Sequence, residues 1–211
     1  MKLYQSIGPN PRVVTMFIAE KGISIPRHFL DIQKGENRTP EFLALNPSGG
    51  TPFLALDNGA HVSESLAICE YLDETQDGPK LVGNTPEERA ETRMYVRRLD
   101  QAVVVPMTNG FRSAEGLKMF ETRMLCVSEA ADGNKAYARD GMAQINGLLE
   151  GKDYLAGDRF SLADMLLFCW LDFGAMVAQP IPEHCTTLKA WHARVAARPS
   201  AAISADPKNG L

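Results

Sequence analysis

The sequence predicts an α/β N-terminal domain followed by an all-α C-terminal domain. In residues 1–77, short strand-like runs alternate with helical patterns, which is typical of a packed α/β domain. Residues 78–85 contain two Gly, a Pro and an Asn, and form the clearest linker of the chain. In residues 86–211 only helical patterns recur. A chain of 211 residues is long enough for two domains that each bury a core.

The chain opens with a strand and a helix. Residues 2–6 alternate in polarity and predict a strand, which the prolines on both sides of Asn10 prevent from continuing. Asn10 is predicted to be the N-cap of the helix and Pro11 its first residue, because both residue types are preferred at those positions. Gly22 is predicted to end this helix.

The remaining elements of the first domain complete an α/β unit. They are a strand at 27–32, a short helix at 39–45, a strand at 53–56, a second short strand and a helix that begins at Ser65. Asn58 and Gly59 lie between the two strand-like runs, and Asn-Gly in that setting is the strongest local signal for a hairpin. This order of elements is that of a thioredoxin-like fold, expected to end near Gln76.

The second domain is predicted to contain four main helices. The first begins at a capping box at 85–88 and continues through Val103. The second covers 135–149, the third covers 165–173, and the fourth runs from about 187 to a stop before Pro199. Pro106 is predicted to kink the first of them. Ser161 and Asp164 form a second capping box, to which we assign a role in folding. The segment 165–173 is apolar on nearly every side and is expected to be the buried central helix.

Three motifs in order carry a family resemblance. The chain has Asn-Pro-x-Gly at 46–49, Thr-Pro at 51–52 and Glu-Ser at 64–65, where a helix begins. Together they resemble the glutathione-binding half of the cytosolic glutathione transferases, and the helical half resembles the second domain of that family. The resemblance covers almost the entire chain and implies the glutathione transferase fold and a homodimer.

The resemblance also implies roles for individual residues. Pro52 is expected to follow a cis peptide bond, and Thr51 to pair its backbone with the cysteinyl part of glutathione, as in the addition of a short β-strand. Glu64 is expected to hold the ammonium group of the γ-glutamyl end. Ser65 and the helix N-terminus are expected to hold its carboxylate, because free backbone N–H groups and the helix dipole favour an anion there.

The residue that meets the sulfur departs from the common family patterns. Asn10 stands where bacterial beta-class members carry a Cys, so the sequence offers no protein thiol for a mixed disulfide. Gly8 and Asn10 resemble the nu-class pattern, in which an Asn and a neighbouring Thr meet the sulfur, but Gly8 replaces that Thr. Asn10 is therefore the first candidate and Ser6 a possible substitute. The alternative is that Asn10 only caps the helix.

Three residues are candidates to hold the glycine carboxylate of glutathione. In order of preference, by their match to the family, they are Asn37, Arg38 and Lys34. Each has an alternative interpretation as a solvated loop residue.

Three residues of the long helix are candidates to line a pocket for the electrophile. These are Met107, Phe111 and Arg112. An apolar stripe at helical spacing is more often part of a core, and that alternative stays open.

Composition excludes several other classes of protein. The formal net charge of −4 argues against a nucleic-acid or anionic-membrane surface. The four cysteines and four histidines show no metal-ligand spacing, and we expect no metal. The first residues lack a signal-peptide core and no apolar run could span a membrane, so we expect a cytoplasmic protein without membrane contact.

The sequence therefore predicts a detoxification enzyme that transfers glutathione to small hydrophobic electrophiles. Glutathione would be a co-substrate. Glutathione-dependent reduction of disulfides, or cleavage of an ether at the same site, is an alternative reaction. A non-catalytic glutathione-binding or interaction module is the alternative of a different class, because one fold can host many functions.

Overall fold

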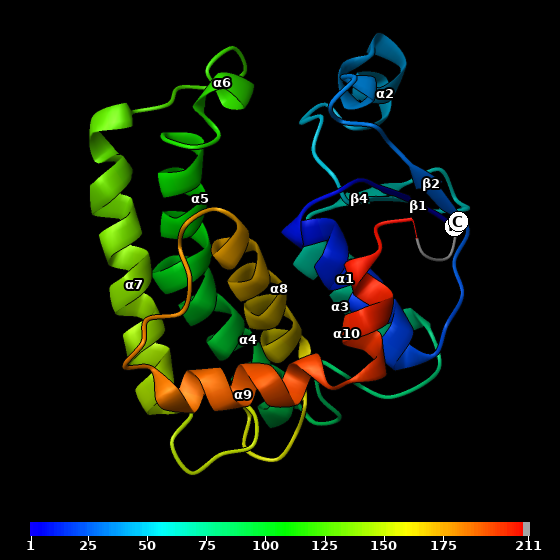
Figure 1. The fold of residues 1–211 in the computed structure, drawn as a ribbon. Helices are drawn as coiled ribbons and strands as arrows, with labels where there is room; N and C mark the ends of the chain where they lie inside the picture. Colours follow the sequence, from blue (N-terminus) through cyan, green and yellow to red (C-terminus); the bar gives the residue numbers. More distant parts are fainter. Residues whose placement is uncertain (209–211) are drawn as a thin grey trace. The chain divides into compact units, whose positions relative to one another are not determined.

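The computed structural model describes residues 1–208 and contains two compact units (Figure 1). One unit comprises Met1–Thr85 together with the chain from Ala196 onward, and the other comprises Pro86–Val195. The sequence prediction assigned the segment from Ala196 to the helical domain, and the structure differs there. Among the described residues, no helix combines the length and the apolar character needed to span a bilayer.

The first unit is built on a four-stranded mixed sheet. Its strands are β1 (Lys2–Gln5), β2 (Arg27–Phe29), β3 (Phe53–Ala55) and β4 (His61–Ser63), in the order β2-β1-β3-β4. β1 pairs in parallel with β2 and antiparallel with β3, and β3 pairs antiparallel with β4. The β3–β4 pair is the hairpin that Asn58 and Gly59 predict. The thioredoxin-like arrangement is confirmed.

Four α-helices and a 3₁₀ turn accompany the sheet. They are α1 (Pro9–Lys21), the 3₁₀ turn η1 (Glu36–Arg38), α2 (Pro40–Leu45), α3 (Ser65–Thr75) and α10 (Pro199–Ala205). The predicted start of α1 is wrong, because the N-cap is Gly8 and Pro9 is the first helical residue. Pro9 has the backbone angle that a first helical residue needs, so the helix begins before Asn10. Asn10 therefore does not cap α1.

The C-terminal helix α10, which the sequence did not predict, packs along α1 (Figure 1). The guanidinium of Arg198 donates two hydrogen bonds to the carboxylate of Glu20, at 2.8 and 2.7 Å. Burial is the largest single effect on the pKa of Glu20 and raises it. The bonds from Arg198 and Ser200 together outweigh burial, so the pKa is lowered. The Gln5 side chain donates to the carbonyl of Pro207 at 2.8 Å. The segment from Ala196 thus completes the first unit.

The second unit is helical. Its elements are α4 (Pro86–Leu99), a π-helical turn labelled η2 (Asp100–Val104), α5 (Val105–Arg112), α6 (Leu117–Phe120), η3 (Ser128–Ala130), α7 (Ala131–Leu148), α8 (Leu162–Met176) and α9 (Thr186–Ala196). The π-helical turn lies just before Pro106, which has no N–H to continue an α-helical ladder. Helix α7 packs closely against this turn, because a Cβ on Gly141 would lie 2.0 Å from the carbonyl oxygen of Ala102. Only glycine fits there.

Helix α8 is the buried centre of the second unit. Every residue from Leu162 to Leu171 is buried, as the apolar segment 165–173 predicts. The predicted capping box is confirmed, with the backbone N–H of Ser161 donating to Asp164 at 3.0 Å. Asp164 also accepts from the backbone of Leu155 at 3.0 Å and from the indole of Trp191 at 3.1 Å. This carboxylate therefore hydrogen-bonds to the start of α8, to the segment at Leu155 and to α9.

Burial raises the pKa of Asp164 to about 6, against the lowering effect of these hydrogen bonds. A carboxyl whose pKa is higher in the folded state binds its proton more tightly there, so folding is favoured where it is protonated. We expect this group to destabilise the fold by on the order of 3 kcal/mol as pH rises from about 4 to about 6. Asp164→Asn should remove that part of the pH dependence. Urea unfolding of both proteins across this range measures it, and equal pH slopes would contradict the assignment.

Candidate functional site

A polar turn at residues 46–50 leads into β3. The buried Asn46 amide donates to the carbonyl of Gly50 at 2.9 Å and its oxygen accepts from the Ser48 hydroxyl at 2.9 Å. Gly49 has φ 61°, and a Cβ there would lie 2.6 Å from a guanidinium nitrogen of Arg38. The turn is therefore shaped by its own side chains and by close approach of Arg38.

Thr51 and Pro52, which the family resemblance identified as glutathione-binding residues, follow this turn. The peptide bond between Thr51 and Pro52 is cis, as expected. The hydroxyl oxygens of Ser6 and Thr51 are 2.6 Å apart, and the Ser6 hydroxyl also donates to the carbonyl of Ile7 at 3.0 Å. Ser6 is buried, with 1% of its surface exposed. Its hydroxyl is thus bonded to Thr51 directly after β1.

Helix α3 brings Glu64 and Ser65 to the first helix. Glu64 is the N-cap of α3 with φ 73°, a left-handed conformation that costs energy for a residue with a side chain. Within residues 1–208, no side-chain cap hydrogen bond is found at the start of α3. Ser65 is buried and its hydroxyl donates to the side-chain oxygen of Asn10 over 3.5 Å. The Ser65 hydroxyl thus reaches Asn10 and does not cap α3.

This arrangement leaves donors available for an anion and for a thiolate. The uncapped N-terminus of α3 is a favourable place for a carboxylate. Because Ser65 uses the oxygen of Asn10, the amide NH₂ of Asn10 keeps its two donors for another acceptor. Asn10 is partly exposed and lies in the first turn of α1, where the helix dipole also favours negative charge.

The three candidates for the glycine carboxylate lie differently. Asn37 is buried and donates to the carbonyl of Gly49 at 2.7 Å, while its oxygen finds no partner among residues 1–208. Arg38 donates to the carbonyl of Ser48 at 3.3 Å. Lys34 instead pairs with Asp31 at 3.2 Å and, mainly through that hydrogen bond, lowers the pKa of Asp31. Asn37 and Arg38 thus hydrogen-bond to the turn at residues 46–50, and Lys34 is paired with a neighbouring carboxylate.

The three candidates for the electrophile pocket all lie in α5. Met107 is fully buried, and its backbone carbonyl accepts from Gln179 at 3.0 Å, so it packs the core of the helical unit. The ring of Phe111 lies 5.2 Å from that of Phe173 and 5.9 Å from that of Phe120, both edge to face. Of the three, Arg112 lines a cavity.

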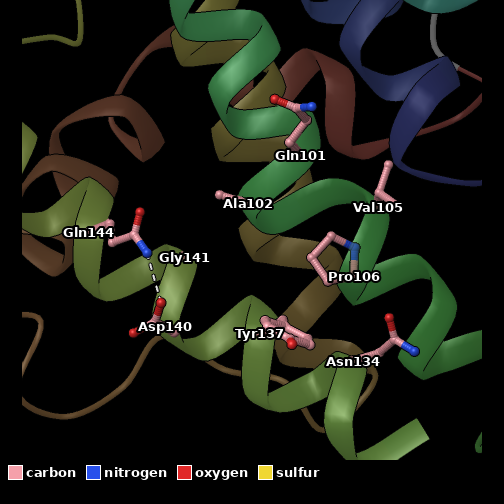
Figure 2. Close-up of a pocket in the computed structure, with 9 residues that line it drawn as sticks. All are labelled: Gln101, Ala102, Val105, Pro106, Asn134, Tyr137, Asp140, Gly141 and Gln144. Carbon is pink, nitrogen blue, oxygen red and sulfur yellow. Dashed lines mark hydrogen bonds between the residues drawn. The ribbon is translucent and has the colours of Figure 1, made fainter. Parts of the chain in front are cut away.

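Two hollows of modest size lie in the described part of the second unit. One, of about 270 Å³, lies between the start of α5 and the middle of α7, and Figure 2 shows Pro106 and Tyr137 facing it from the two helices. The other, of about 230 Å³, lies at the far end of α5 and includes Arg112. Asn109 and Ser113 also line it, and the sequence reading missed both. Asn109 lies three residues before Arg112 and four before Ser113, and this helical spacing was the available signal.

Comparison with known proteins finds matches to one family in both units. The family described as "Glutathione S-transferase, N-terminal domain" matches residues 7–75, and "Glutathione S-transferase, C-terminal domain" matches residues 118–199. The chain is 36% identical over 195 residues to glutathione S-transferase 2 of Saccharomyces cerevisiae, covering 92% of this chain and 84% of the relative.

A solved structure and a differently named relative add to this. A glutathione S-transferase domain-containing protein from Marinobacter aquaeolei VT8 superposes with a TM-score of 0.89 at 38% identity, covering 95% of this chain and 99% of that one. The chain is also 31% identical over 199 residues to FtsZ-localized protein A of Caulobacter vibrioides, covering 92% of this chain and 85% of the relative.

Proposed function

Because the chain belongs to the glutathione S-transferase family, we propose that it transfers the thiolate of glutathione to small hydrophobic electrophiles. The observation that carries this proposal is the meeting of Ser65 and Asn10 beside the uncapped N-terminus of α3. That arrangement offers one set of donors to a carboxylate and another to a sulfur. Glutathione is a co-substrate in this proposal, which involves no metal.

The tripeptide would lie along the edge formed by the turn, β3 and the start of α3. Its cysteinyl backbone would pair with the backbone of Thr51, ahead of cis-Pro52. Its γ-glutamyl carboxylate would meet Ser65 and the α3 N–H groups, and its ammonium would meet Glu64. Its glycine carboxylate would meet the second N–H of the Asn37 amide and the guanidinium of Arg38.

Activation of the sulfur would rest on Asn10. A thiol with a pKa near 8.5 is only about 3% ionised at pH 7, and donors that bond the thiolate lower that pKa. The gain in thiolate is partly offset because a weaker base is a weaker nucleophile. Asn10 would therefore contribute a moderate factor, and placement of the electrophile the remainder.

Replacing Asn10 by alanine tests this role. We expect kcat/KM to fall by about tenfold or more, because a hydrogen bond to a charged acceptor is lost, and the pKa of bound glutathione to rise. Stability should change little, because Gly8 and not Asn10 is the N-cap of α1. Steady-state kinetics and ultraviolet titration of the thiolate measure both. Unchanged turnover with an unchanged thiol pKa would remove Asn10 from the chemistry.

The reaction type is tested with immobilised glutathione and two substrates. We expect retention on the resin and turnover of chlorodinitrobenzene. Turnover of hydroxyethyl disulfide alone would favour the reductase alternative. Within the first unit the single cysteine, Cys69, is fully buried, so such a reductase would have to work without a protein thiol.

A binding module is the competing class, and the relative named for its localisation to FtsZ is the observation that favours it. Retention on glutathione without turnover of either substrate would support this class. Loss of both retention and turnover would leave neither form of the proposal standing.

We further propose that the protein is a cytoplasmic homodimer. The hollow in Figure 2 is bordered by Tyr137, which is 72% exposed, and Val105, which is 45% exposed. Exposed apolar side chains around a depression favour a protein contact. Sedimentation giving about twice the chain mass of 23.1 kDa would support the dimer, and the mass of a single chain would exclude it.

A further inference from the structure

The cavity at the end of α5 has a polar side and an apolar side. Its volume is about 230 Å³. Asn109 and Arg112 lie on one face of α5, and Ser113 directly follows that helix. These three residues supply donors, whereas Met124 and Val127 come from the segment before α7. A cavity with an apolar wall and a few convergent polar groups is the usual form of a small-molecule site.

No acid in the described part of the chain is paired with the cation in this cavity. Among residues 1–208, no carboxylate forms an ion pair with Arg112 and no hydrogen bond to its guanidinium is found. The nearby acid Glu115 is paired with Lys135. The guanidinium is half-buried and lies 5.1 Å from the centre of the Phe120 ring. Burial lowers the pKa of Arg112, partly offset by Cys126, yet an arginine stays charged at neutral pH.

The apolar wall is exposed in the free protein. Met124 is 40% exposed, Leu125 90% and Val127 45%. These neighbouring apolar side chains lie beside the unpaired guanidinium. A ligand that covered them while meeting the cation would bury apolar area and neutralise a partly desolvated charge at once.

We propose that this cavity binds a small amphipathic carboxylate, with its apolar body against Met124 and Val127 and its carboxylate on Arg112. Asn109 and Ser113 donate to the carboxylate oxygens that Arg112 leaves free. A simpler interpretation is that Arg112 only offsets the dipole at the C-terminus of α5. That role needs neither a cavity nor an adjacent exposed apolar segment.

Resting on the proposed function, a carboxylate of this class that carries a leaving group is also a substrate with which to test the enzyme. With chlorodinitrobenzoate, the glutathione sulfur would attack the ring carbon that carries chlorine. A C–S bond forms, the C–Cl bond breaks, chloride leaves with the electron pair, and the thiol proton passes to solvent.

Binding is tested with unreactive ligands on the full chain. Dinitrobenzoate and its methyl ester share one ring and differ in charge. We expect wild-type protein to bind the carboxylate about tenfold or more tightly than the ester by calorimetry, and Arg112→Gln to lose that preference. Arg139→Gln, on an exposed arginine of α7 outside the cavity, is the matched control and should keep it. Arg112→Lys keeps the charge without the planar fork and should show an intermediate preference.

Equal binding of acid and ester by wild-type protein, no binding of the acid, or full preference in Arg112→Gln would overturn the site. If Arg112→Gln does not fold, the intermediate preference of Arg112→Lys decides, and an unchanged preference there counts against the site. Turnover of chlorodinitrobenzoate and its ester separates the two proposals. Carboxylate binding with no turnover of either leaves the cavity intact and rejects the transferase function. Turnover of both with no carboxylate preference in binding supports the transferase function and rejects the cavity.

Discussion

Asp73→Ala should lower the free energy of unfolding by about 3–5 kcal/mol, because it leaves a buried lysine without its counter-charge. The side chain of Lys21 is completely buried and lies 3.2 Å from the carboxylate of Asp73. The same carboxylate accepts from the backbone N–H groups of Leu81 at 2.9 Å and Val82 at 3.2 Å. One substitution therefore unpairs a cation and two backbone donors where α1, α3 and the linker meet.

Glu74→Ala is the matched control, since Glu74 is the next residue of α3 and is exposed. It should change the free energy of unfolding by no more than about 0.5 kcal/mol. Chemical denaturation of the three proteins measures both values. An Asp73→Ala variant as stable as Glu74→Ala would show that the pair with Lys21 contributes nothing to the fold.

Ser65→Ala should weaken glutathione binding by about ten- to a hundredfold. In the proposed complex its hydroxyl donates to the γ-glutamyl carboxylate, and hydrogen bonds to charged groups are among the stronger ones. In the free protein this single hydroxyl hydrogen points to the oxygen of Asn10, so glutathione binding exchanges one acceptor for the other. We therefore expect the KM for glutathione to rise, with a smaller change in kcat. Steady-state kinetics with glutathione varied at fixed electrophile measures both constants.

Ser24→Ala is the control for this prediction, because Ser24 is an exposed serine of the same unit between α1 and β2. It should leave both constants unchanged. An equal, small effect of the two substitutions would show that the carboxylate does not bind at the start of α3.

Local chemistry predicted those parts of the fold whose signals lie within a few residues. The hairpin follows from Asn58-Gly59, and the capping box of α8 from Ser161 and Asp164. The start of α1 was misplaced because Pro9 and Pro11 both suit a first helical position, and sequence alone does not choose between them. Helix α10 was missed because its contacts join residues nearly 180 positions apart, as between Glu20 and Arg198.

For the site, too, local motifs were predictable from the sequence and long-range contacts were not. The motifs identified Thr51, Pro52, Glu64 and Ser65 as residues, but not which side chains they meet. The contacts Ser6–Thr51 and Ser65–Asn10 join positions 45 and 55 residues apart, and no local pattern encodes them. Met107 was expected in a pocket and is fully buried, because a helical apolar stripe does not reveal what covers it.

The central claim is that the first unit holds glutathione by its γ-glutamyl end at Glu64, Ser65 and the start of α3. Calorimetric titration of the wild-type protein with glutathione and with cysteinylglycine, which lacks that end, tests it most directly. We expect saturable binding of one glutathione per chain and at least about tenfold weaker binding of cysteinylglycine. No heat of binding at millimolar glutathione, or equal affinity for the two peptides, would contradict the claim.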